Sequence, residues 1–379
     1  MRIGISAFAG DGGKSGISQY MINIFQRLPD LAPEDEFVMF MAASDREFLD
    51  PQHARVHVVS FPDWLAKPGV NILWHLFLLP WYLWRHACDL VYMPAGNRRL
   101  AWWYGVPSVG TVHDLSQLHV PAKYDRLRMY YVVRLLPRLM RRLDHVVSVS
   151  EATKRDLVSF AHVAPERISV VHNGADLGRF SPHNRAAAAQ QLQEEFGLTG
   201  PYILYIARLE HPGKNHVALI EAFARLKREQ RIPHRLVLPG GEWNGVEAIY
   251  AAARESGVED HIDFLGFVSH DVLPALYAGA DLFVFPSLFE GFGIPLLEAM
   301  ASGTPVCAAD VASIPEVVGD AGLLFDPTDL GQIADCIERI INDKQLRSEL
   351  VALGLQQATR FSWDNASRDV LRLCHENRD

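Results

Sequence analysis

Glu290 and Glu298 are the carboxylates of this chain that are best placed to bind a polar ligand, because they flank a glycine-rich turn. An apolar run over residues 280–285 predicts a buried strand before the turn, and Pro295 predicts the start of a helix that ends at Gly303. Glycine lets the backbone approach a ligand closely, and the free N–H groups of a helix start favour an anion. Isolated glutamates on such turns are commonly solvated. This pair, however, suits a sugar joined to a diphosphate and a ribose, whose hydroxyl groups would donate to the carboxylates.

Residues 289–306 resemble, in order, the signature F-E-G-F-G-I-P-x-L-E-A-M-A-x-G-x-P-V of the retaining nucleotide-sugar glycosyltransferases of family 4. The resemblance implies that Glu290 holds hydroxyl groups of the transferred sugar and that Glu298 holds the ribose. It also implies donor contacts from Gly291, Phe292, Gly293 and Ile294.

Two cationic side chains follow the apolar run over residues 202–207: Arg208 comes directly after it, and Lys214 lies in the segment 211–216. Both are therefore expected at the carboxyl end of a strand, where cations can neutralise a diphosphate leaving group. Cations at the start of a loop are commonly solvated, so the residues alone leave this role open. The segment resembles the A-R-L-x-x-x-K-N-like segments that hold the donor phosphates in the family, which implies that role for Arg208 and Lys214.

The loop over residues 10–15 contains a lysine and a serine after several glycines, which invites comparison with a Walker A motif. That motif requires glycine at the position of Phe8, so ATP binding is weakly supported. Residues 15–20, S-G-I-S-Q-Y, are more similar to the family's G-G-I-G-R-Y, a loop that meets the donor diphosphate. The resemblance implies donor contacts from Ser15, which replaces a glycine, and from Gly16.

His113 follows an apolar run over residues 108–112, at the same kind of strand end. A lone histidine among the sixteen of this chain is more often structural than catalytic. Family members carry a histidine at this V-H-D position beside the transferred sugar, which implies that His113 hydrogen-bonds the sugar hydroxyls. Recognition of the base in this fold uses backbone near Gly266, which implies donor contacts from Phe267 and Val268.

No metal site is predicted, because the chain lacks a D-x-D placed at a strand end and its histidines have no ligand spacing. Arg208, Lys214 and a helix start are available to stabilise a departing diphosphate. We therefore expect a reaction without a metal or other cofactor.

Composition is that of a globular protein with two domains: 379 residues, of which 49% are hydrophobic and 21% charged. The net charge of −9 argues against broad nucleic-acid binding. Four scattered cysteines without a C-x-x-C pair favour reduced thiols in a cytoplasmic protein. The amino terminus predicts a strand rather than a signal peptide, and no apolar run reaches the roughly 18 residues that a spanning helix needs.

Short apolar runs alternate with helical patterns along the whole chain, which predicts an α/β fold with parallel sheets and right-handed crossovers. The expected strands are residues 2–8, 36–41, 56–60, 89–93, 108–113, 145–150, 168–172, 202–207, 235–238, 262–265, 281–286, 305–308 and 322–325.

The domain boundary is expected in the polar, alanine-rich stretch 179–195. We predict an N-terminal domain over residues 1–182, a C-terminal domain over 183–360 and a final helix over 361–379 with Ser362 as its cap. The resemblance implies the GT-B fold, with two Rossmann-like, doubly wound parallel-sheet domains that face a cleft. The acceptor would then bind the first domain and the nucleotide sugar the second, and the C-terminal helix would cross back to pack on the first domain.

Two segments of the first half suit a membrane surface. Residues 71–84 contain three tryptophans among leucines, and residues 123–142 contain seven Lys and Arg against one acid. Aromatic and basic helical faces bind anionic bilayers, although a core helix and a solvated face are the alternative. We expect a peripheral contact at the inner face of the cytoplasmic membrane, made by the run Trp74–Trp84 and by Arg126, Arg128, Arg134, Arg138, Arg141 and Arg142.

Together these features predict a retaining glycosyltransferase that moves a hexose from a nucleoside diphosphate to a glycan or a polyprenyl-diphosphate-linked glycan. General likeness favours mannose from GDP-mannose, during exopolysaccharide or lipopolysaccharide synthesis. UDP-glucose and other donors stay open. So do two alternatives. One is a nucleotide-sugar epimerase of the same fold, which the E-x7-E pattern and the lipid-like face disfavour, and the other is an inactive binding module, which the intact site residues disfavour.

Overall fold

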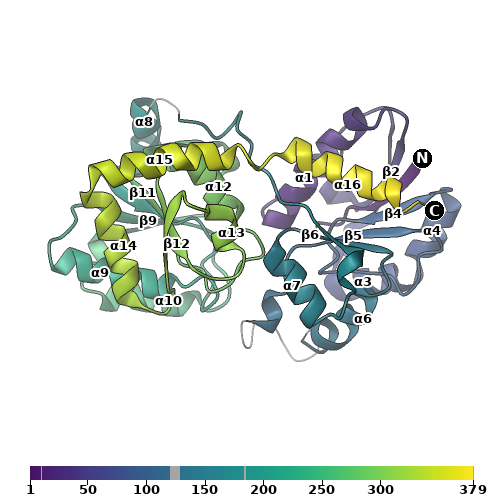
Figure 1. Cartoon of the computed structure of the whole chain (residues 1–379), viewed down its shortest axis with the longest axis horizontal. Helices are drawn as coiled ribbons and strands as arrows, with labels where there is room; N and C mark the ends of the chain where they lie inside the picture. Colours follow the sequence, from purple (N-terminus) through teal and green to yellow (C-terminus); the bar gives the residue numbers. More distant parts are fainter. Residues whose placement is uncertain (10, 120–128, 183–184, 379) are drawn as a thin grey trace. The chain divides into compact units, whose positions relative to one another are not determined.

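The structure is a computed structural model that describes residues 1–9, 11–119, 129–182 and 185–378 (Figure 1). The chain divides into two compact units. Met1–Gly174 and Ser362–Asp379 form the first unit, and Ala175–Phe361 forms the second. The first unit therefore ends a short way before the boundary placed after residue 182, and the C-terminal segment belongs to the first unit.

The sheet of the first unit has seven parallel strands in the order β3-β2-β1-β4-β5-β6-β7. The strand β1 lies inside the sheet, where Ile3 is paired with both Phe37 and Leu90. The chain first builds the sheet to one side of β1 and then to the other, and ligands of doubly wound sheets collect at such a reversal. The strands are β1 (Arg2–Ser6), β2 (Glu36–Ala42), β3 (Val56–Phe61), β4 (Leu90–Met93), β5 (Ser108–Val112), β6 (His145–Ser148) and β7 (Ile168–Val170).

Helices cover both faces of this sheet. They are α1 (Gly16–Leu31), α2 (Arg46–Leu49), α3 (Pro68–Phe77), α4 (Leu79–Arg85), α6 (Leu136–Met140), α7 (Glu151–Ser159) and α16 (Trp363–Glu376). A π turn over Tyr131–Leu135 precedes α6.

The C-terminal helix α16 lies beside α1 (Figure 1). It is attached there by an ion pair from Arg27 Nε to Asp364 Oδ1, at 2.7 Å. Its start packs closely on Gly174, where a Cβ atom would lie 2.1 Å from the backbone nitrogen of Trp363. Glycine is therefore required at the end of the first unit's main segment.

The second unit has a six-stranded parallel sheet in the order β10-β9-β8-β11-β12-β13. Its strands are β8 (Tyr202–Leu204), β9 (Arg235–Pro239), β10 (Ile262–Gly266), β11 (Leu282–Phe285), β12 (Val306–Ala309) and β13 (Gly322–Phe325). Its helices are α8 (Arg185–Phe196), α9 (His216–Arg228), α10 (Val246–Glu255), α11 (Leu273–Gly279), α12 (Ile294–Ala301), α13 (Ile314–Val318), α14 (Leu330–Asn342) and α15 (Lys344–Ala358).

Every strand predicted from the sequence is present, which confirms the α/β fold with two parallel sheets. Parallel strands are covered on both faces, so they stand out in a sequence as short apolar runs. The ends differ by a few residues. For example, β8 stops at Leu204, although Ala207 N still donates to Pro239 O at 3.2 Å. The predicted cap Ser362 accepts a hydrogen bond from Asn365 N and is confirmed. Within the described residues, no helix combines the length and the apolar character needed to cross a membrane.

Candidate active site

Three neighbouring strands of the second sheet, in the order β9-β8-β11, position the loops that carry the predicted donor residues. Because the strands are parallel, their carboxyl ends lie at one edge of the sheet. Arg208 and Lys214 follow β8, Glu290 follows β11 and Trp243 follows β9. The strand order therefore brings segments that are distant in sequence into contact.

Lys214 and Glu290 form an ion pair, with Lys214 Nζ 2.6 Å from Glu290 Oε1. The Lys214 side chain is 22% exposed and that of Glu290 is 15% exposed. Both charges are thus largely withdrawn from water, where each stabilises the other more strongly than a surface pair would. Two residues that the sequence assigned to different parts of a donor are therefore direct partners of each other.

The backbone on both sides of this pair is fixed by buried hydroxyl groups. Tyr205 donates its phenolic hydrogen to the carbonyl of Lys214 at 2.8 Å, and its oxygen lies 3.1 Å from Ser287 Oγ. Burial raises the pKa of Tyr205 well above its usual value, so the hydroxyl keeps its proton. Ser313 Oγ lies within hydrogen-bond distance of the carbonyls of Glu290, at 2.9 Å, and Phe292, at 3.0 Å. The loop that carries Glu290 is therefore preorganised.

Arg208 is held from two directions. Its Nη2 atom donates to Glu210 Oε2 at 3.1 Å, and its guanidinium carbon lies 4.8 Å from the centre of the Trp243 ring. The Glu210 side chain is only 6% exposed, whereas Arg208 is about half exposed. Gly240 makes this arrangement possible, because a Cβ atom there would lie 1.8 Å from the carbonyl oxygen of Ala207. The positively charged guanidinium of Arg208 is therefore held in one orientation.

Glu298 lies on α12 and is half-buried. Tyr277 donates its phenolic hydrogen to Glu298 Oε2 at 2.8 Å. Burial raises the pKa of Glu298 to about 7; the Tyr277 hydrogen bond and the charge of Arg179 act in the opposite direction, and Asp176 adds to the increase. Glu298 therefore titrates near neutrality and is not an ordinary solvated carboxylate.

The remaining predicted donor residues of the second unit lie in turns. Gly293 has a φ of 109° and occupies the cap position of α12, whose first residue is Ile294. Phe292 is 4% exposed and packs edge-on against Phe361, at 5.8 Å between ring centres. Its ring belongs to the core, so Phe292 can meet a donor only through its backbone.

The chain turns at Gly266, the last residue of β10, which has a φ of 68°. Phe267 is 53% exposed, while Val268 is buried. Phe267 is thus the accessible side chain of the two, and Gly291, which is buried in the turn after Glu290, offers only backbone atoms.

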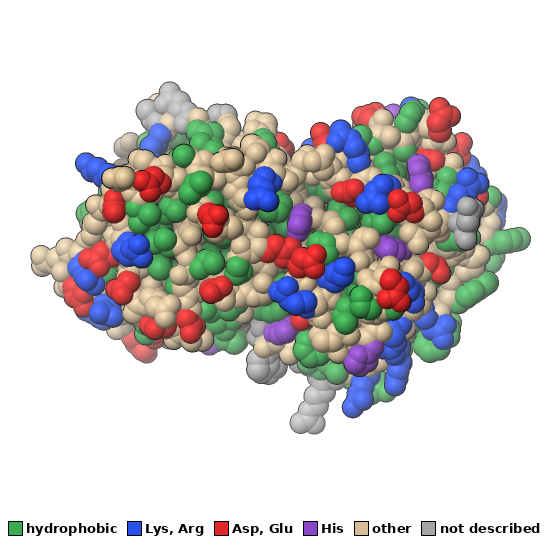
Figure 2. Space-filling view, viewed as in Figure 1, with side chains coloured by type: hydrophobic (Ala, Val, Ile, Leu, Met, Phe, Trp, Pro, Cys, Tyr) green, Lys and Arg blue, Asp and Glu red, His purple; other side chains and the backbone are tan. Residues whose placement is uncertain are grey.

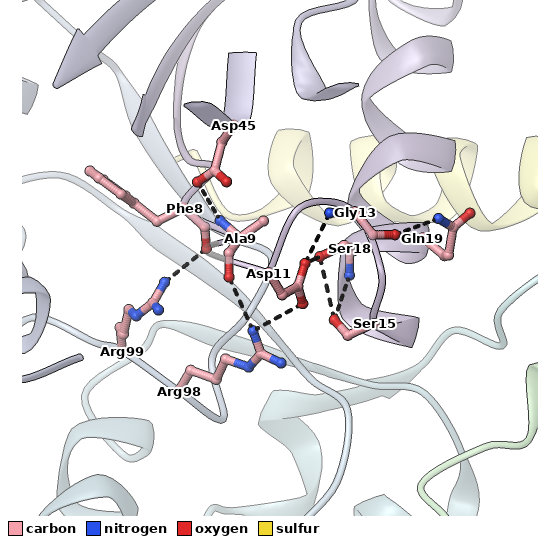
Figure 3. Close-up of polar contacts among 10 residues, drawn as sticks. All are labelled: Phe8, Ala9, Asp11, Gly13, Ser15, Ser18, Gln19, Asp45, Arg98 and Arg99. Carbon is pink, nitrogen blue, oxygen red and sulfur yellow. Dashed lines mark hydrogen bonds and ion pairs between the residues drawn. The ribbon is translucent and has the colours of Figure 1, made fainter. Parts of the chain in front are cut away.

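In the first unit, the loop between β1 and α1 is a network of hydrogen bonds (Figure 3). Ser15 is the cap of α1 and accepts from Ser18 N at 3.3 Å. Asp11 Oδ1 accepts from Gly13 N at 3.1 Å and from Ser18 Oγ at 2.5 Å, and Asp11 Oδ2 lies 4.0 Å from Arg98 Nη1. Gly16 is exposed, with no atom within 4 Å of where its Cβ would be, so its surroundings leave room for a ligand.

His113 follows β5 and is 7% exposed. Its Nε2–H donates to the carbonyl of Pro94 at 2.8 Å, and its ring meets the edge of Tyr20 at 4.7 Å between centres. Burial lowers the pKa of His113 to about 4. The imidazole is therefore neutral near pH 7, with Nδ1 as its acceptor, which suits a residue that accepts a hydroxyl hydrogen more than one that donates a proton.

No three His, Cys, Asp or Glu side chains of the described residues are grouped so that they could hold a metal ion. The expectation that no cofactor is needed stays a prediction.

Sequence reasoning did not identify the residues that hold the site. These are Tyr205, Glu210, Trp243, Tyr277 and Ser313. The only sequence signals are that Tyr205 lies inside the predicted strand 202–207 and that Glu210 and Trp243 lie shortly beyond predicted strands, where many residues have no role.

Two family models together match most of the chain. The model described as Glycosyltransferase Family 4 matches residues 14–179, and the one described as Glycosyl transferases group 1 matches residues 188–356.

Bacterial glycosyltransferases are similar to large parts of the chain. O-antigen chain mannosyltransferase B of Escherichia coli is 34% identical over 264 residues, which are 70% of this chain and 69% of that protein. Serotype-specific mannosyltransferase WbdA of the same species is 31% identical over 265 residues, 69% of this chain but only 32% of that longer protein. The structure of HepE from Anabaena in complex with UDP and glucose superposes with a TM-score of 0.76 at 22% identity. It covers 99% of this chain and 100% of HepE, which shows a shared fold.

Proposed function

The chain belongs to the GT-B glycosyltransferases described by the family 4 and group 1 models, and on this basis we propose a specific transfer reaction. A hexose moves from a nucleoside diphosphate to a hydroxyl group of the acceptor, with retention of the anomeric configuration. No nucleophilic side chain is needed in this proposal, because the donor phosphate accepts the acceptor proton on the same face of the sugar.

The ion pair of Lys214 with Glu290 is the observation that carries this proposal. A diphosphate competes with Glu290 for Lys214, since phosphate oxygens are strong acceptors for an ammonium group. Glu290 is then released to accept hydrogen bonds from sugar hydroxyls. A single exchange of partners thus makes Lys214 available to the phosphate of the donor and Glu290 available to its sugar.

Arg208 supplies the second charge. Because Glu210 and Trp243 hold its guanidinium before the donor arrives, little reorganisation is needed as negative charge develops on the leaving diphosphate. Glu298 is assigned to the ribose hydroxyls and His113 to the sugar hydroxyls. We assign Ser15 and Gly16 to the diphosphate through backbone N–H groups at the start of α1.

We propose GDP-mannose as the donor and mannose as the transferred sugar, because both relatives from Escherichia coli are mannosyltransferases. UDP-glucose or another donor is the alternative within the same reaction. An epimerase of the same fold is disfavoured, since these relatives are named as transferases.

The acceptor that we propose is a glycan or a polyprenyl-diphosphate-linked glycan of exopolysaccharide or lipopolysaccharide synthesis, in keeping with the O-antigen named for one relative. A lipid-linked acceptor would place the enzyme at the inner face of the cytoplasmic membrane, in peripheral contact with anionic lipid.

A panel of sugar nucleotides tests the proposal. The protein is incubated with GDP-mannose, UDP-glucose and related donors, with and without a lipid-linked glycan, and the release of nucleoside diphosphate is measured. We expect GDP-mannose to give the fastest release and the anomeric signals of the product to show an α-linkage, matching the donor. Conversion of a donor to its epimer without an acceptor, or an inverted product, would overturn the assignment.

A further inference from the structure

The first unit exposes large aromatic side chains to an unusual degree. Among the described residues, the four most exposed large hydrophobic side chains are Trp84 (74%), Phe77 (69%), Tyr130 (67%) and Trp103 (66%). All four belong to this unit. In Figure 2, hydrophobic side chains project from the right-hand edge of this unit, and Lys and Arg side chains gather on its lower part.

These four residues come from one layer of the fold. The helices α3 and α4, the loop over residues 97–107 and the helical segment 129–140 all pack their inner sides into a single core cluster over one face of the sheet. Trp74 and Leu83, for example, lie in that cluster and are at most 2% exposed. We call the outer side of this layer the aromatic face.

The helices α3 and α4 carry both apolar residues that face the core and apolar residues that are exposed. Trp81 and Trp84 are three residues apart on α4 and share one side of it, and Phe77 is the last residue of α3. Trp74 and Leu83 point to the core, so the pair is apolar on the inside and on the outside. Helices that are apolar all round are normally covered on every side. This corrects the expectation that Trp74–Trp84 acts as one unit, because Trp74 is core while Trp81, at 51%, and Trp84 are exposed.

The three segments that carry these exposed rings have charge of one sign. Residues 67–88, 97–107 and 129–143 contain no Asp or Glu, although the chain as a whole has 45 acids and a net charge of −9. The same segments contain the basic residues Lys67, Arg85, Arg98, Arg99, Arg134, Arg138, Arg141 and Arg142.

One of these cations lies against an exposed ring, and two others are exposed. The guanidinium carbon of Arg142 lies 4.3 Å from the centre of the Trp102 ring, and Arg134 and Arg138 are exposed on the helical segment. Arg141 instead donates to the carbonyl of Ala161 at 2.7 Å and is partly committed to the fold. Arg126 and Arg128, which the sequence also suggested, lie outside the described residues.

We infer that the aromatic face binds the surface of an anionic lipid bilayer, with Phe77, Trp81, Trp84 and Trp103 entering the interface and Arg134 and Arg138 meeting lipid phosphates. Trp and Tyr prefer the boundary between headgroups and acyl chains, and arginine beside them extends to the phosphates. The inference rests on the membrane contact in the proposed function and names the surface that makes it. Vesicle binding is measured without a donor, so its failure can be told apart from failure of the transfer reaction.

Two other occupants fit the face less well. In a symmetric pair with a second copy, the same basic, acid-free surface would face itself, so like charges would meet. A glycan needs carboxylate or amide side chains beside the aromatic rings to accept its hydroxyl hydrogens, and the acid-free segments offer none of the carboxylates.

Flotation of the full-length protein with vesicles tests the inference, without any donor present. We expect binding to vesicles that contain phosphatidylglycerol and little binding to pure phosphatidylcholine. Arg134→Glu with Arg138→Glu should weaken binding at low salt by at least about fivefold for each substitution. At high salt a part of the binding should persist, and Phe77→Ser with Trp84→Ser should remove it, by roughly tenfold for each ring.

Matched controls keep the test specific. Arg254→Glu with Lys344→Glu places the same charges on the second unit, and Phe160→Ser removes an exposed ring, 46% accessible, from the end of α7 in the first unit. None of these should change binding.

Circular dichroism should show that every variant is folded, and donor hydrolysis in solution should be unaltered in the variants of the aromatic face, so failure of the proposed function would be seen separately. Absence of binding to phosphatidylglycerol at low salt, equal losses in the controls, or a dimer that dissociates in Phe77→Ser with Trp84→Ser would overturn the inference.

Discussion

The ammonium group of Lys214 lies 2.6 Å from a carboxylate oxygen of Glu290, across 76 residues of chain. The contact exists because β8 and β11 are neighbours in the sheet, so the loops that follow them meet. Each side chain is largely buried and neutralises the other, and removal of either leaves a partly buried charge without its partner. The ion pair therefore links the stability of the second unit to the exchange of partners that we propose for donor binding.

Loss of either cation should slow transfer strongly. We expect Lys214→Ala and Arg208→Ala each to lower the transfer rate by about 10² to 10³, because a preorganised charge at a leaving diphosphate typically contributes that much. Steady-state release of nucleoside diphosphate measures the effect, with thermal unfolding to show that the variants are folded. A folded variant with near-normal turnover would remove that residue from the site.

Glu290 and Glu298 should separate sugar transfer from nucleotide binding. Glu298→Ala should weaken the binding of the free nucleoside diphosphate, because Glu298 is assigned to the ribose. Glu290→Ala should not weaken that binding, because it frees Lys214 for the diphosphate, and should mainly lower transfer. Isothermal titration calorimetry with the free nucleoside diphosphate gives the first quantity and product formation the second. The reverse pattern would exchange the two roles.

The raised pKa of Glu298 predicts a pH-dependent contribution to stability. Its pKa is about 7 in the folded chain, against an ordinary glutamate value of 4.5, so between these values the folded state holds a proton that the unfolded state has lost. The stabilising contribution is complete below about pH 4.5 and is lost as the pH rises to 7.

The difference in Tm between the native protein and Glu298→Gln isolates this contribution from other titrating groups. Relative to the variant, the native protein should lose Tm between about pH 4.5 and about pH 7, the range between the ordinary and the raised pKa of Glu298. A difference in Tm that is constant over this pH range would show that Glu298 of the folded chain does not hold a proton there.

Much of the fold could be predicted from the sequence, because parallel strands that are buried on both faces consist of short apolar runs. The strand ends also revealed where Arg208, Lys214 and Glu290 lie along the chain. The order of strands in a sheet is set by long-range packing, however, so the pairing of Lys214 with Glu290 could not be predicted.

The same limit applies to side chains that act through burial. Tyr277 reaches Glu298 from α11, and nothing in its local pattern distinguishes it from an ordinary core tyrosine. Periodicity likewise failed for α3 and α4, because helices with apolar residues on every side give no indication of which ones face the core. Trp74 and Trp84 became distinguishable only when the helices were packed on the sheet.

Transfer should continue in excess EDTA. Arg208, Lys214 and the backbone N–H groups at a helix start are available to stabilise the departing diphosphate, so a divalent cation is not required in our proposal. The rate of release of nucleoside diphosphate is compared before and after chelation, in the same buffer. Abolition of the reaction by EDTA, with recovery on addition of Mg²⁺ or Mn²⁺, would contradict the prediction.

Glu210 and Trp243 should act on the reaction through Arg208. Glu210 is buried and fixes one edge of the guanidinium, and the Trp243 ring covers one face of it. Trp243→Ala should therefore lower the transfer rate by roughly tenfold, because the charge remains but its direction is no longer fixed. Trp243→Phe should restore most of the rate, since another ring can stack on Arg208. Glu210→Gln should retain a hydrogen bond to Arg208 and give a smaller loss than Glu210→Ala.

In the background of Arg208→Ala, neither Trp243→Ala nor Glu210→Gln should have a further effect on transfer, and double-mutant cycles measure this directly. Losses that simply add in the double variants would show that these residues support the fold and not the orientation of Arg208.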